Sequence, residues 1–180
     1  MNIKPWLVLV AACGVVTVAP AMDLVPSGAF VQGGIGDFGA RNATAGVWWG
    51  WNWRRGLGSA ELSGVTEAYV SRWSSVFEGR RRGVTQVALV PLLRLRPEAG
   101  ASPWFMELGI GVSTMDKLYL TRDEGFSTRF NFVDVLGIGR NFGEGRRHEL
   151  SLRFAHISNA NIKSPNPGEN FLQLRYAASF

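Results

Sequence analysis

The stretch FAHISNANIKSPNPGENF, residues 154–171, places a histidine and a serine two residues apart in an otherwise apolar, strand-like sequence. Residues i and i+2 of a strand share one face, with Cα atoms roughly 6–7 Å apart, which lets an imidazole nitrogen reach a hydroxyl oxygen. His156 is therefore a candidate general base for Ser158, and a carboxylate on its other ring nitrogen would fix its tautomer. Glu169 is the only acid downstream of Glu149 and is the candidate for that carboxylate. The pattern favours serine-hydrolase chemistry, and an interfacial pair with no catalytic role is the alternative.

Residues 1–21 have the pattern of a secretory signal peptide, with a positive charge at Lys4, an apolar run over residues 6–18 and small residues before the cut. The apolar run of about thirteen residues is shorter than the roughly 17–25 that a spanning helix needs. A lipoprotein processing site at Cys13 is the alternative, but the apolar run continues past this cysteine. We expect an exported mature domain, residues 22–180, that contains no cysteine and depends on neither a disulfide nor a thiol.

Apolar side chains alternate with small or polar ones along the mature domain. Examples are WFMELGIGVS at 104–113, VALVPLLRLR at 87–96 and ELSLRFAHIS at 149–158. Alternation with a period of two is typical of strands with one apolar face. It predicts eight strands, near residues 28–39, 43–54, 60–73, 84–96, 103–114, 127–141, 147–157 and 169–180.

Short turns and longer polar loops alternate between these strands, which favours an all-β fold, an eight-stranded antiparallel transmembrane β-barrel of the outer membrane. A lipocalin-like barrel would instead place its apolar face inside and carry many Lys and Glu outside, and lysine is scarce here. The last strand ends in Phe180 after alternating apolar residues, which resembles the carboxyl-terminal signal of bacterial outer-membrane proteins. The whole of 22–180 is therefore expected to form one barrel.

The same alternation orients the candidate site. Leu150, Leu152 and Phe154 share the lipid-facing side of their strand, and His156 and Ser158 continue that side at its extracellular end. A polar pair that faces lipid is costly unless it is hydrogen-bonded or functional. Four charged residues are expected to form an ion-paired network inside the barrel: Arg94, Glu107, Asp134 and Arg153.

The motif over residues 154–171, the small barrel and the terminal aromatic residue resemble the outer-membrane lipid A 3-O-deacylase family (PagL type). The resemblance covers the mature chain loosely and the motif closely. It implies a serine-hydrolase triad on the lipid-facing surface of the barrel, with two asparagines that help form the oxyanion hole. The triad roles fall on His156, Ser158 and Glu169, and the asparagine roles fall on Asn159 and Asn166.

The position of the triad acid depends on the alignment of the loop. Glu169 comes three residues after Asn166, whereas the family also shows a spacing of four, which falls on Asn170. An amide cannot act as a charge partner for histidine, and this favours Glu169.

The expected activity is that of an esterase which removes the acyl chain at the 3 position of lipid A. An outer-membrane phospholipase and a non-catalytic adhesin or structural barrel are the alternatives. Arg80, Arg81 and Arg82 lie in a predicted extracellular loop and are candidates for the phosphates of the lipid A head group, because guanidinium groups bind phosphate through paired donors. Binding to neighbouring lipopolysaccharide or exposure to water is the alternative for this cluster.

No cofactor and no nucleic-acid partner are expected. The modest basic excess suits anionic lipid, which an exported protein meets more often than nucleic acid. A metal site is not expected either, since His148 and His156 are the only imidazole donors. The pattern G-x-G-x-x-G at 34–39 lies in a predicted strand that no helix follows, so it does not indicate a dinucleotide site. The sequence leaves the oligomeric state open.

Overall fold

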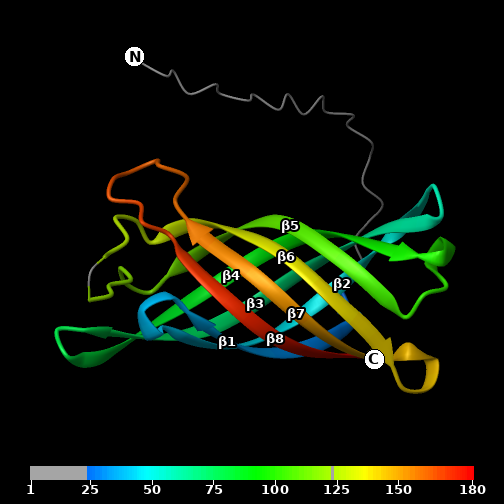
Figure 1. Cartoon of the computed structure of the whole chain (residues 1–180), viewed down its shortest axis with the longest axis horizontal. Coiled ribbons are helices and arrows are strands. Elements are labelled where there is room, and N and C mark those ends of the chain that lie inside the picture. Colours follow the sequence, from blue (N-terminus) through cyan, green and yellow to red (C-terminus); the bar gives the residue numbers. More distant parts are fainter. Residues whose placement is uncertain (1–23, 123) are drawn as a thin grey trace, which may run out of the picture.

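The computed structural model describes residues 24–122 and 124–180, which form a closed barrel of eight antiparallel strands in chain order (Figure 1). The predicted signal peptide, residues 1–21, lies outside the described residues. Among the residues described, no helix is long and apolar enough to cross a membrane. The strands are β1 Gly28–Gly36, β2 Arg41–Leu57, β3 Ala60–Phe77, β4 Arg80–Pro97, β5 Trp104–Met115, β6 Phe130–Phe142, β7 His148–Ser158 and β8 Glu169–Ser179.

The eight-stranded fold was predicted correctly, and the largest difference concerns the hairpin of β3 and β4. The sequence SSVFEGRRRG was expected to form a loop, but the pairing of these strands continues to Phe77 opposite Arg80. Only Glu78 and Gly79 form the turn, both with positive φ (49° and 72°). The Arg82 guanidinium lies 4.6 Å from the centre of the Phe77 ring. Cross-strand contacts of this kind stabilise strand pairing even where the side chains are charged.

The outer surface is apolar, as the alternation predicts. In β5 the outward residues Leu108 and Ile110 are 57% and 64% exposed, whereas Phe105 and Glu107, on the opposite face, are buried. The outward side chains of β7 and β8 are likewise apolar over most of each strand. An exposed apolar surface of this extent is unfavourable in water and suits the hydrocarbon layer of a membrane.

Charged side chains fill part of the interior. Arg153 bonds Glu67 at 2.8 Å and Glu107 at 2.6 Å, and Arg94 bonds Glu107 at 2.9 Å and Glu149 at 2.7 Å. Arg175 joins the network by pairing with Glu67 and Glu149. Three arginines thus face three glutamates, and pairing offsets the cost of burying the charges. The network contains the following residues: Glu67, Arg94, Glu107, Glu149, Arg153 and Arg175.

Three of the predicted interior residues, Arg94, Glu107 and Arg153, are confirmed, and the prediction for Asp134 is wrong. Asp134 shares its face of β6 with Leu136, which is 55% exposed, and not with the buried Val133 and Val135. Side chains alternate along a strand, so this position points to the outer surface. There it lies opposite His156 of β7.

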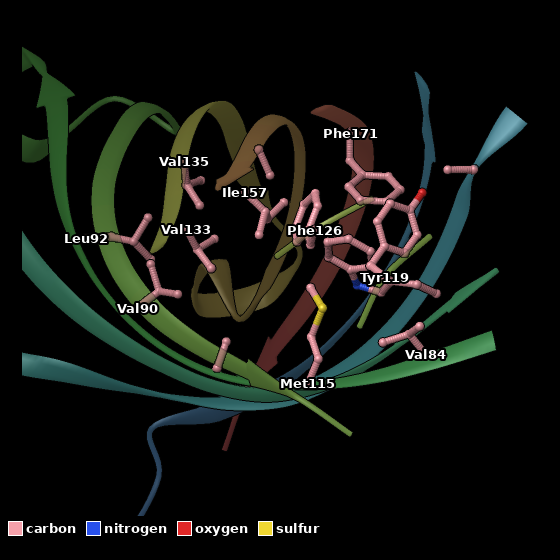
Figure 2. Packing of buried hydrophobic residues seen from close by; sticks show 14 of the residues in the cluster. Val84, Val90, Leu92, Met115, Tyr119, Phe126, Val133, Val135, Ile157 and Phe171 are labelled. Atoms are coloured by element: carbon pink, nitrogen blue, oxygen red, sulfur yellow. The ribbon is translucent and has the colours of Figure 1, made fainter. Parts of the chain in front are cut away.

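An aromatic cluster packs inside the barrel near the end that carries the long connections (Figures 1 and 2). Tyr119 and Phe126, from the β5–β6 connection, fold back into the interior with ring centres 5.2 Å apart. Trp73 of β3 contacts both Tyr119 and Phe171 of β8, at 5.1 and 4.7 Å between ring centres. The cluster therefore fixes the β5–β6 connection against the first residues of β8.

Candidate active site

His156 and Ser158 lie at the end of β7 and on the outer face of the barrel, as predicted from the alternation. In Figure 1 this end of β7 lies beside the long connections. Both residues are half-buried, and Phe154, the preceding residue on the same face, is 48% exposed. Phe132 of β6 is opposite Ser158. The rings of Phe132 and the exposed Phe130 lie 5.5 Å apart, edge to face. The polar pair therefore borders an apolar surface and does not face the lumen.

The hydrogen-bond partner of His156 is Asn170 on the neighbouring strand. The two residues are opposite each other in the β7–β8 register, and His156 Nδ1 lies 2.8 Å from Asn170 Oδ1. Asn170 Nδ2 in turn donates to Asp37 Oδ2 at 2.9 Å. A side-chain amide thus stands between the histidine and a carboxylate.

Glu169 does not contact His156, so the expected Glu169–His156 pair is corrected. The side chain of Glu169 is buried inside the barrel, where it accepts hydrogen bonds from Tyr119 Oη (2.6 Å) and from the Asp37 backbone N–H (2.7 Å). The reason is that β8 begins at Glu169, opposite the inward-facing Ile157. Side chains at consecutive strand positions point to opposite faces, which puts Asn170, and not Glu169, beside the histidine.

Tyr119 supports this buried carboxylate. Burial, the larger cause, and the hydrogen bond to Glu169 both hold the pKa of the Tyr119 phenol above its usual value. The phenol therefore keeps its proton and remains a hydrogen-bond donor. Glu169 thus fastens the β5–β6 connection and the turn at Asp37 to the start of β8.

The two asparagines predicted at the oxyanion hole differ in what they can donate. The side chain of Asn159 is buried, and its Nδ2 donates to Ser127 Oγ (3.0 Å) and the Lys163 carbonyl (2.8 Å). Its backbone N–H donates to Asn166 Oδ1 at 2.8 Å. That bond holds the Asn166 amide next to the peptide that follows Ser158. Asn166 is half-exposed, and its Nδ2 donates a long hydrogen bond, 3.3 Å, to Asn161 Oδ1.

Gly168 fits against the imidazole of His156. Its φ is +77°, a conformation that side chains disfavour, and a Cβ placed there would lie 2.7 Å from His156 Cε1. The β7–β8 loop thus approaches the histidine through a position that admits only glycine without strain. The ring is therefore confined by Gly168 as well as by Asn170.

The third predicted group, Arg80, Arg81 and Arg82, is not brought to the site. These exposed arginines begin β4, which is three strands from β7, and their partner β3 is diametrically opposite β7 in the ring of eight. In Figure 1 the β3–β4 hairpin projects at the same end of the barrel as the β7–β8 loop but well separated from it. The cluster therefore lies away from His156 and Ser158 around the barrel.

Asp37 is the member of the site that sequence reasoning missed. It lies within the glycine pattern at 34–39, which drew attention only as a rejected nucleotide motif. Asn170 was considered and set aside, although the alternation that places Leu172 and Leu174 outward also places Asn170 outward. No group of three or more His, Cys, Asp or Glu side chains suited to a metal ion occurs in residues 24–122 and 124–180.

The closed barrel and its apolar outer surface define an outer-membrane β-barrel protein, and a histidine and a serine lie on that outer surface at the end of β7. A family model described as lipid A 3-O-deacylase (PagL) matches residues 40–179. The chain therefore belongs to the PagL family of lipid A 3-O-deacylases, as its motif indicates.

Two relatives and one solved structure are similar to the chain. The lipid A deacylase PagL of Bordetella bronchiseptica is 28% identical, over 96% of this chain and 92% of the relative. The lipid A deacylase PagL of Pseudomonas aeruginosa is 27% identical, over 94% of each. The crystal structure of the outer-membrane enzyme PagL matches this chain with a TM-score of 0.73 and 24% sequence identity, and the match covers 85% of this chain and 99% of the chain in that crystal structure. The last comparison shows that the two share the barrel fold.

Proposed function

We propose that this chain hydrolyses the 3-position acyl ester of lipid A in the outer leaflet, with Ser158 as nucleophile and His156 as general base. The observation that carries the proposal is the hydrogen bond from His156 Nδ1 to Asn170 Oδ1. It occupies one ring nitrogen and leaves Nε2 to accept a proton from the serine two residues further along the same face. A nucleophile beside an oriented base is the arrangement that acyl transfer requires.

The reaction proceeds in two steps. Ser158 Oγ attacks the ester carbonyl while His156 Nε2 takes the hydroxyl proton, and the same nitrogen then returns that proton to the departing sugar oxygen. A water molecule, deprotonated by His156, hydrolyses the resulting acyl-serine and releases the fatty acid. The histidine ends each half-reaction in its starting state, so the cycle needs no cofactor.

The oxyanion of the tetrahedral intermediate takes its hydrogen bond from Asn166 in this proposal. Asn166 is half-exposed, and the bond from the Asn159 N–H to its Oδ1 fixes the direction of the amide. The role proposed for Asn159 is to orient Asn166, since the side-chain nitrogen of Asn159 already donates to Ser127 Oγ and to the Lys163 carbonyl. A donor that is already oriented stabilises developing charge without reorganisation.

The position of the site suits a substrate that stays in the membrane. Phe132, opposite Ser158, and Phe154 below His156 offer apolar contacts to an acyl chain. Lipid A reaches Ser158 by lateral diffusion in the outer leaflet, so the chain need not pass through water. Burial of each methylene group is worth about 0.8 kcal/mol, which makes extraction of a long acyl chain costly.

The test is expression of the full chain, with its signal peptide, in a host of known lipid A composition, followed by mass spectrometry of lipid A and phospholipids. The wild-type chain should remove the 3-position acyl group. Ser158→Ala and His156→Ala should each lower the rate by about a thousandfold or more while the heat-modifiable gel mobility of a folded barrel is retained. His148→Ala, a change at the opposite end of β7, is the matched control and should remain active.

Other outcomes distinguish the alternatives. Lysophospholipid in place of deacylated lipid A would identify a phospholipase, and unchanged lipids with a folded barrel would indicate a non-catalytic protein. Appreciable activity in folded Ser158→Ala would refute the assignment of Ser158 as the nucleophile.

A further inference from the structure

Asn170 stands where a histidine-orienting carboxylate would be expected, and it is itself bonded to a carboxylate. The bonds run from His156 Nδ1 to Asn170 Oδ1 at 2.8 Å and from Asn170 Nδ2 to Asp37 Oδ2 at 2.9 Å. Asp37 belongs to the β1–β2 turn, at the other end of the sequence from the motif. The three side chains therefore form one connected chain on the outer surface.

The direction of the amide in this chain is not arbitrary. An ionised carboxylate has acceptors only, so the amide group that faces Asp37 must be the NH₂ group. The amide oxygen then faces His156, and it can only accept, so the ring nitrogen beside it must carry the proton. The charge on Asp37 thus sets which way Asn170 points, and Asn170 sets the tautomer of His156.

The position of Asp37 is itself fixed by two backbone hydrogen bonds. Its N–H donates to Glu169 Oε1 at 2.7 Å, and its carbonyl accepts from Ala40 N–H at 2.9 Å. Glu169 is buried and also bound by Tyr119, so the turn is fastened to the barrel interior. The Asp37 side chain is consequently held at the outer surface, next to β8.

We infer that Asp37 is a positioning residue for the reaction, which acts through Asn170 to keep His156 in the tautomer with Nδ1 protonated and Nε2 free to accept the serine proton. This inference rests on the proposed function of Ser158 and His156. Asn170 and Asp37 together take the role that a single acidic residue has in a Ser-His-acid triad. Asn170 supplies the contact and Asp37 supplies the negative charge, which also stabilises the imidazolium that forms during the reaction.

Within residues 24–122 and 124–180, a further carboxylate lies beside the histidine. Asp134 lies opposite His156 on β6, the strand on the other side of β7. Directly opposed side chains have Cβ atoms roughly 4.5–5.5 Å apart, close enough for an electrostatic effect. Nδ1 is engaged by Asn170, however, so the tautomer should not depend on Asp134.

The experiment measures the tautomer directly, by ¹⁵N chemical shifts of histidine in the full mature chain in detergent micelles. The chain has two histidines, so comparison with His156→Ala identifies the signals of His156. The variants are Asp37→Asn, Asp134→Asn and the exchange variant Asp37→Asn with Asn170→Asp. The exchange puts the carboxylate beside the histidine and the amide behind it, with the same number of atoms and charges.

Asp37→Asn should raise the population of the tautomer protonated at Nε2 and lower kcat for lipid A about ten- to hundredfold, with little change in KM. The exchange variant should restore the Nδ1-protonated form and bring kcat to within a few-fold of wild type. Asp134→Asn should leave the tautomer unchanged. Rescue by exchange would not occur if Asp37 only stabilised the turn.

An unchanged tautomer in Asp37→Asn, or a shift in Asp134→Asn alone, would overturn the inference. A failure of the proposed function looks different: the wild-type chain would not deacylate lipid A, whatever its tautomer.

Discussion

Glu169 and Asn170 are consecutive in the sequence and lie on opposite sides of the barrel wall. Glu169 points into the interior, to Tyr119 Oη at 2.6 Å, whereas Asn170 points outward, to His156 Nδ1 at 2.8 Å. Both residues affect the site. Asn170 contacts His156 directly, and Glu169 holds the turn that contains Asp37. One step along a strand thus separates a scaffold residue from a site residue.

The first prediction ranks these two neighbours. In Glu169→Gln the amide oxygen can still accept from Asp37 N–H, and the amide nitrogen can donate to Tyr119 because a phenol oxygen also accepts. We expect the rate of lipid A deacylation to fall only a few-fold. Asn170→Ala removes the partner of His156 Nδ1 and should lower kcat by about a hundredfold or more. Rates in detergent micelles measure both, and the opposite ranking would return the orienting role to Glu169.

A second prediction concerns the glycine beside the histidine. Gly168→Ala places a Cβ 2.7 Å from His156 Cε1 and should displace the ring, with a loss of kcat of about a hundredfold. The matched control is Gly79→Ala in the β3–β4 turn, where φ is +72° but nothing lies within 4 Å of the added Cβ. Both changes strain the backbone similarly, and only Gly168→Ala touches the site. Equal activities would show that contact with Gly168 does not position His156.

A third prediction concerns the arginine cluster of β4. Because β3 and β4 lie across the barrel from β7, replacement of Arg80, Arg81 and Arg82 by glutamine should not weaken recognition of the lipid A that occupies Ser158. Any change in the rate of the triple variant should therefore be by the same factor on lipid A and on a neutral ester without a head group. Selective loss on lipid A would mean that the cluster contacts the substrate despite its position.

A fourth prediction concerns the charged interior. Arg153→Met takes one buried arginine partner from both Glu67 and Glu107, so that three buried glutamates face only two arginines of the network, and should destabilise the barrel by about 3–5 kcal/mol. Arg140→Met, an exposed change on β6 beside Trp104, should cost less than about 1 kcal/mol. Urea unfolding in micelles, followed by heat-modifiable mobility, compares the two. Similar stabilities would show that the arginine contributes little to the folded barrel.

The sequence alone was enough to predict the fold and the outward orientation of His156 and Ser158. Side chains alternate with a period of two, so the outward apolar residues of β5, β7 and β8 and the outward position of His156 and Ser158 follow from local order. The pairing of Arg94, Arg153 and Glu107 inside follows from the same alternation, since their positions face away from lipid. Asp134 was misplaced because its charge was given more weight than its position in the strand.

Only the tertiary structure decided what surrounds the histidine. Alternation along β8 gives Asn170 an outward side chain, but its place opposite His156 depends on the register of β8 against β7, which the sequence pattern does not show. The closure of β1 on β8 brings Asp37 to Asn170 across 133 positions of the chain, and no local pattern encodes that contact. The location of Arg80–Arg82 away from the site follows once the strands close into a ring in chain order, because β4 then lies three strands from β7.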